Sequence, residues 1–102
     1  MTEDILLECA PDLLAAVREE LGSLAVEPVD AMERKNFDGS SSVWIVLATL
    51  AVQALPNFVT LIAKHIDRGG VTKIQIGDII IENPQEKDLE LLRELMAKRL
   101  ST

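Results

Sequence analysis

The sequence predicts a small α+β sandwich with the element order β-α-β-α-β-β-α, in which a long hydrophobic central helix precedes a C-terminal hairpin and a final helix. Three observations point to this fold class. Short apolar segments near both ends have strand-like patterns, and leucines recur at helical spacing after Pro11 and after Pro84. Residues 39–63 carry no formal charge and are mostly large and apolar. One segment therefore dominates the expected core.

The first part of the chain is predicted to form a strand, a helix and a second strand. Ile5–Cys9 alternates at a period of two, and Pro11 then opens a helix because proline is favoured in the first turn. Ala25–Met32 is a weaker strand, and Pro28 within it suggests the sheet edge. We expect a single domain, 1–102, with strand-helix-strand in 1–38, the long helix in 39–68, and the hairpin and terminal helix in 71–100.

The uncharged segment predicts a helix because its polar residues are ordered. They recur every three or four residues, which traces one stripe along a helix. The stripe comprises Thr49, Gln53, Asn57, Thr60, Lys64 and Asp67. Pro56 is expected to kink or divide this helix near its middle.

Three environments are open to such a helix. In a buried core it would need another chain over its outer flank, because a domain of 102 residues cannot surround it alone. A membrane span is a second option, although the polar residues interrupt the apolar run. A helix lying on a membrane surface is disfavoured, because its polar face lacks Lys and Arg except near its end.

The clearest local structure is a hairpin. Val71–Ile76 and Ile79–Asn83 flank Gly77 and Asp78, and glycine at the first loop position suits a type II′ turn. The expected register places Ile76 opposite Ile79, Ile74 opposite Ile81, and Lys73 opposite Glu82.

Composition excludes some classes of partner and favours one compartment. A net charge of −7 and only three aromatic residues, one Trp and two Phe, argue against nucleic-acid binding. The lone Cys9 excludes an intramolecular disulfide and suits a reducing compartment, and the acidic N-terminus is unlike an export signal. The predicted localisation is cytoplasmic, with the inner membrane as the alternative.

Catalytic signals are sparse, so the sequence predicts no enzyme, no cofactor and no metal site. Cys9 and His65 could in principle form a thiol–imidazole pair, but no nucleophile motif surrounds Cys9. Cys9 is more simply a buried strand residue and His65 a residue near a helix end.

The ending VTKIQIGDIIIENPQEKDLELLRELMAKRL, together with the order of elements and the long uncharged helix, resembles the effector-associated constant component domains of bacterial conflict systems. The resemblance covers residues 43–100. It implies a non-enzymatic constant module that is paired with variable effectors, such as peptidases or nucleotide-hydrolysing proteins. The chain departs from the pattern in the purity of its uncharged run and in Pro56.

The function predicted from these observations is a non-enzymatic interaction and assembly module of a bacterial conflict or signalling system. It would self-associate as a homo-oligomer or dock an effector through the long helix. The alternative is a small membrane effector whose helix spans the bilayer and self-associates into a pore. The expected interaction residues are Trp44, Leu47, Ala51, Gln53, Asn57, Phe58, Thr60 and Ile62.

Overall fold

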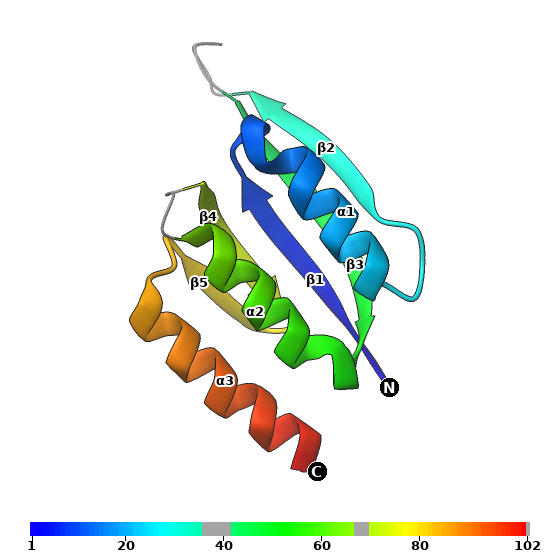
Figure 1. Cartoon of the computed structure of the whole chain (residues 1–102), viewed down its shortest axis with the longest axis vertical. Coiled ribbons are helices and arrows are strands. Elements are labelled where there is room, and N and C mark those ends of the chain that lie inside the picture. The colour runs from blue at the N-terminus through cyan, green and yellow to red at the C-terminus, as the bar shows by residue number, and fades with distance from the viewer. Residues whose placement is uncertain (36–41, 67–69, 102) are drawn as a thin grey trace.

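The computed structural model describes residues 1–35, 42–66 and 70–101. These residues form strands β1 (Thr2–Cys9), β2 (Asp30–Lys35), β3 (Ser42–Ala51), β4 (Val71–Ile76) and β5 (Ile79–Glu82), and helices α1 (Leu14–Leu24), α2 (Leu55–Ile66) and α3 (Glu86–Ser101). Short 3-10 turns at Pro11–Leu13 and Val52–Ala54 lead into α1 and α2. The α+β class is confirmed (Figure 1).

The strands form one antiparallel sheet with the order β2-β3-β1-β4-β5. Strand β1 pairs with β3 on one side and with β4 on the other. In the connection β1-α1-β2, strand β3 lies between the two strands, and in β3-α2-β4 strand β1 does so. This is the split βαβ arrangement, to which β5 and α3 are added.

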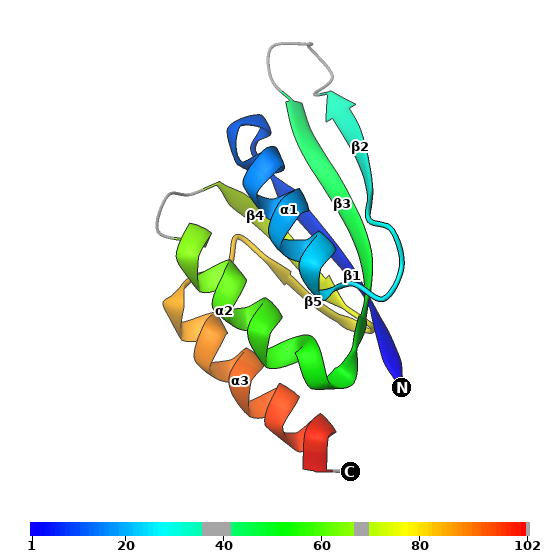
Figure 2. The same cartoon turned by 45° about the vertical axis from the view of Figure 1, so that its right-hand side comes forward.

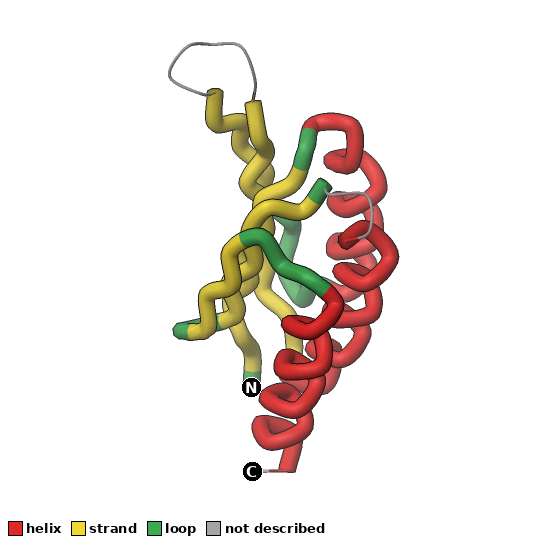
Figure 3. Tube along the Cα trace, turned by 90° about the vertical axis from the view of Figure 1, so that its left-hand side faces the viewer, coloured by secondary structure: helices red, strands yellow, loops and turns green. Residues whose placement is uncertain are grey.

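All three helices pack on one face of the sheet, and α2 lies between α1 and α3 (Figures 1 and 2). The core fills the space between this face and the helices. Its fully buried side chains include Ile5 and Leu7 of β1, Leu50 of β3, Phe58 and Ile62 of α2, and Leu92 of α3. Seen edge-on, the opposite face carries no helix from the described part of the chain (Figure 3).

The predicted long helix over 39–68 is wrong, because residues 42–51 form β3. The chain enters α2 only at Leu55, and α2 ends at Ile66; residues 39–41 and 67–68 lie outside the described residues. Val43, Trp44, Ile45 and Val46 are β-branched or aromatic, and such residues favour strands. Because β3 is at least half-buried on both faces, it lacks the alternation that marks a strand in the sequence.

Pro56 lies in the first turn of α2, so it starts a helix and does not kink one. Proline is tolerated there because the first N–H groups of a helix have no intrahelical partner. The helices within the described ranges are too short or too polar to span a membrane.

The hairpin prediction is confirmed. Ile76 pairs with Ile79, Ile74 with Ile81 and Lys73 with Glu82, and Gly77 has a φ of 58°. The predicted second strand lies later than expected, at Asp30–Lys35 instead of Ala25–Met32, although it is an edge strand as predicted.

Candidate functional site

The face of the sheet that points away from the helices is the candidate functional site, and we call it the open face. Successive side chains of a strand point to opposite sides, so the residues between the core positions lie here. The open face comprises Asp4, Leu6 and Glu8 of β1, Asp30, Met32 and Arg34 of β2, Val43, Ile45, Leu47 and Thr49 of β3, Lys73 and Gln75 of β4, and Ile80 and Glu82 of β5.

The centre of the open face is apolar. Leu6 of β1 stands opposite Leu47 of β3, and Ile45 of β3 stands opposite Met32 of β2. Leu6, Ile45 and Leu47 are half-buried by their neighbours in the sheet, whereas Met32 and Ile80 are 50% and 54% exposed. A contiguous apolar surface of this kind is typical of an interaction site.

Glu8 places a carboxylate within this apolar surface. The residue is only 6% exposed. Arg34 reaches from the edge strand β2 across β3, and its Nη1 lies 3.1 Å from Glu8 Oε1. The Thr72 hydroxyl donates a hydrogen bond of 3.5 Å to the other carboxylate oxygen. The guanidinium supplies a countercharge to a group that burial alone would disfavour, while 57% of the Arg34 side chain stays exposed.

Charged side chains of both signs surround the apolar centre. Asp4 accepts a hydrogen bond of 3.1 Å from the Thr49 hydroxyl. Lys73 stands in register between Glu8 on β1 and Glu82 on β5. Asp30 is exposed at the start of β2. An apolar centre with a polar rim is the usual anatomy of a protein interface.

The predicted interaction residues are distributed over different parts of the fold. Leu47 lies on the open face, whereas Trp44 is half-buried against the core on the helix side. Phe58 and Ile62 are fully buried inside the domain. The others lie near or on α2: Ala51 ends β3, Gln53 is exposed in the 3-10 turn, and Asn57 and Thr60 are exposed on α2.

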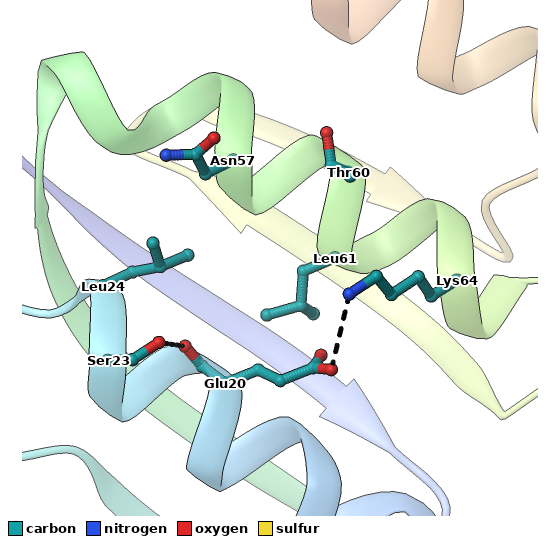
Figure 4. A pocket seen from close by; sticks show the side chains of 7 residues that line it. All are labelled: Glu20, Ser23, Leu24, Asn57, Thr60, Leu61 and Lys64. Atoms are coloured by element: carbon teal, nitrogen blue, oxygen red, sulfur yellow. Dashed lines mark hydrogen bonds and ion pairs between the residues drawn. The ribbon is translucent and has the colours of Figure 1, made fainter.

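Asn57, Thr60 and Lys64 of the predicted polar stripe do share one side of α2, where they line a shallow groove of about 240 Å³ against α1 (Figure 4). Asp67 lies outside the described residues. Lys64 Nζ is 3.8 Å from Glu20 Oε1 on α1. The hydroxyls of Ser23 and Thr60 donate to backbone oxygens of their own helices. Most polar groups of the groove are thus engaged within the chain.

Cys9 and His65 have different surroundings. Burial, together with the nearby Asp12 carboxylate, raises the pKa of the Cys9 thiol from 9.0 to about 11. Such a thiol is protonated at neutral pH and is a poor nucleophile. His65 is buried with its Nε2 3.3 Å from Glu20 Oε2. Across the described ranges, no group of three or more His, Cys, Asp or Glu side chains could hold a metal ion.

The fold and the site define a small split βαβ domain with helices on one face of its sheet and an apolar surface on the other. No protein-family model matches the sequence, and no curated protein is significantly similar to it. The function proposed below therefore depends on the geometry of the open face.

Sequence reasoning missed the open face as a site, apart from Leu47. A signal for it was present in β1, because Leu6 and Glu8 occupy the positions that alternate with Ile5, Leu7 and Cys9. The matching positions of β3 could not be recognised while residues 42–51 were assigned to a helix.

Proposed function

We propose that this chain is a non-enzymatic interaction module that binds a protein partner, either itself or an effector, through the open face of its sheet. The observation that carries the proposal is the contiguous apolar surface formed by Leu6, Ile45, Leu47 and Met32 across three strands. Its burial in a complex would contribute roughly 25 cal/mol per Å² of apolar area. The Glu8–Arg34 pair at its centre would restrict which partners fit.

The mode of docking differs from the one expected from the sequence. Phe58 and Ile62 stabilise the domain itself and have no exposed surface to offer. The α1–α2 groove is small, and its polar groups are mostly engaged with one another. The open face extends across the strands of the sheet and brings Leu6, Ile45, Leu47 and Met32 together, so it is the better candidate for binding.

The resemblance to effector-associated constant component domains supports an effector as one class of partner. We therefore propose that the module acts in the cytoplasm in a bacterial conflict or signalling system, where the effector would be a peptidase or a nucleotide-hydrolysing protein. The membrane-pore alternative required one helix through residues 39–68. Because residues 42–51 are a strand, we do not propose it.

Photo-crosslinking in cells tests this function. A photoreactive amino acid in place of Leu47 samples the open face. The same photoreactive amino acid in place of Leu91, whose side chain is 50% exposed, samples the outer side of α3. We expect a discrete protein adduct from position 47 and none from position 91. If position 47 gives no adduct although the chain is folded, the proposed function is wrong.

A further inference from the structure

We propose that the free edge of β5 binds an extended segment of the protein partner, which adds a further strand to the sheet by antiparallel pairing. This inference rests on the proposed function, because it states how the partner that covers the open face would be held. It is carried by the direction of the backbone hydrogen-bonding groups of β5, by its apolar side chains and by the contrast with β2 at the other edge.

The backbone groups of Ile80 and Glu82 point away from β4. In an antiparallel pair, residues whose N–H and C=O groups bond to the neighbouring strand alternate with residues whose groups point outward. The Asn83 N–H donates to the backbone oxygen of Thr72 at 2.9 Å, so Asn83 belongs to the first kind. The register alternates from there, which assigns Ile80 and Glu82 to the second kind. Because β5 is the last strand of the sheet that the structure describes, their outward groups form its free edge (Figure 1).

The two edges of the sheet differ in their side chains. At β2 four of the six residues are charged, and charges on an edge strand oppose pairing with another strand. β5 instead has the sequence Ile-Ile-Ile-Glu, and Ile80 is 54% exposed. A strand added at β5 would therefore gain apolar contacts as well as backbone hydrogen bonds.

The β5 edge is continuous with the open face. Ile80 is in register with Gln75 of β4, and Gln75 is in register with Leu6 of β1. Leu6 in turn stands opposite Leu47 of β3. A partner whose strand pairs with β5 can thus place the rest of its surface over the apolar centre of the open face. Since β5 is only four residues long, stable binding would need these further contacts.

The side chains of β5 predict the chemistry of the added strand. A basic residue fits opposite Glu82, because the carboxylate would then have Lys73 on one side and a second cation on the other. An apolar residue fits opposite Ile80. The residue between these two would lie opposite Ile81, which is half-buried against the core, so it should also be apolar. Read from its N-terminal end, the antiparallel strand would carry a basic residue followed by two apolar residues.

The β5 strand of a second copy does not offer this pattern. If two β5 strands paired antiparallel through their outward groups, Glu82 of each copy would lie opposite Ile80, Asp78 or Glu82 of the other, depending on the register. None of these neighbours supplies a cation to the carboxylate. We therefore assign the edge to a protein other than this chain.

Ile80→Pro tests strand addition in cells. The Ile80 N–H points away from β4, so proline removes a donor to the added strand and leaves the hairpin hydrogen bonds in place. We expect the adduct from the photoreactive amino acid at position 47 to fall by at least about tenfold. Ile80→Val is the matched control, because it keeps the N–H and a β-branched side chain, and its adduct should match that of the parent. Circular dichroism should show that both variants fold.

A synthetic peptide tests the chemistry of the edge in the purified chain. The probe is acetyl-Thr-Lys-Val-Val-Thr-amide, which has the basic, apolar, apolar order. We expect it to slow hydrogen exchange of the Ile80 and Glu82 amides, because both N–H groups would then be hydrogen-bonded. The same peptide with Glu in place of Lys should bind at least about tenfold more weakly. Absence of protection at these two amides would overturn strand addition, and equal protection by both peptides would overturn the assigned chemistry.

The cellular crosslink separates this inference from the proposed function. An adduct from position 47 that persists in a folded Ile80→Pro chain overturns strand addition but leaves the proposed function standing. An adduct of twice 11.2 kDa alone would identify the partner as a second copy, which overturns the assignment to another protein. Absence of any adduct from position 47 in the parent overturns the proposed function and this inference with it.

Discussion

At the scale of single residues, the Glu8–Arg34 ion pair is the main polar contact of the open face. Glu8 is nearly inaccessible, while Arg34 is largely exposed. Removing the Arg34 guanidinium should therefore destabilise the fold mainly because the buried Glu8 carboxylate is left without a countercharge. The lost attraction between the two groups should contribute less.

Arg34→Ala should lower the free energy of unfolding by ~1–3 kcal/mol, because Glu8 loses its countercharge. Replacing Glu8 by Gln in the same chain should restore part of this loss. Lys35→Ala is the matched control, since Lys35 is 72% exposed and lies 4.0 Å from Glu33. It should change stability by less than about 1 kcal/mol. Urea denaturation of the parent, Arg34→Ala, Arg34→Ala with Glu8→Gln, and Lys35→Ala measures these differences. Equal losses of stability in Arg34→Ala and Lys35→Ala would mean that the buried Glu8 carboxylate does not need its countercharge.

Cys9 makes stability depend on pH in the alkaline range. Its pKa is raised from 9.0 to about 11 on folding, so the folded state binds more protons than the unfolded state between these values. This contribution is fully present below pH 9.0 and is lost as the pH rises toward about 11. Cys9→Ala should show a shallower loss of stability across this window. The free energy of unfolding is measured by urea titration of both chains at several pH values. If it falls equally steeply with pH in the parent and in Cys9→Ala, folding does not raise the pKa of the thiol.

At the scale of elements, the hairpin can be tested at its turn. Gly77 has a φ of 58°, where a side chain is strained. Gly77→Ala should destabilise the fold by about 1 kcal/mol. Gly22→Ala in α1 is the control, because its Cβ would meet nothing within 4 Å. Alanine there should stabilise by ~0.5–1 kcal/mol. Thermal melts showing the same sign for both substitutions would contradict the turn assignment.

The hairpin and β3 show which elements the sequence could predict. Gly77-Asp78 between two isoleucine-rich segments is a local signal, because the turn type demands glycine at that position. β3 carries no such signal. α1 covers one face of β3, and sheet neighbours half-bury the other. Because both faces are at least half-buried, apolar residues occupy both sets of alternating positions, and the sequence shows no period of two. Thr49 and Gln53 also lie four residues apart, and Gln53 lies four residues before Asn57, although neither is in α2. The true helical spacing of Asn57, Thr60 and Lys64 therefore continues in the sequence back into β3.

The site was harder to predict than the fold, for a related reason. The open face brings Leu6, Ile45 and Met32 together through pairing between strands far apart in the chain. Register of this kind depends on tertiary structure, which a single sequence does not reveal. The Glu8–Arg34 contact also depends on it, since Arg34 reaches across β3.

At the scale of the whole molecule, the composition of the open face predicts which partners it rejects. Some split βαβ domains bind RNA by stacking bases on aromatic residues of the sheet. The described open face has no aromatic residue, and the chain carries a net charge of −7. We expect no binding of single-stranded RNA at physiological salt in a fluorescence anisotropy titration. Saturable binding that weakens with salt would contradict this expectation.

If the open face binds a protein partner, it is covered in the cell, and hydroxyl-radical labelling of Met32 reports on this coverage. Met32 is 50% exposed in the isolated chain, Leu91 has the same exposure on α3, and Met96 is 1% exposed in the core. We expect Met32 to be oxidised in the dilute purified chain but protected in cells. Leu91 should be oxidised to the same extent in both conditions, and Met96 should stay unreactive in both. Equal oxidation of Met32 in cells and in dilute solution would mean that no protein covers the open face.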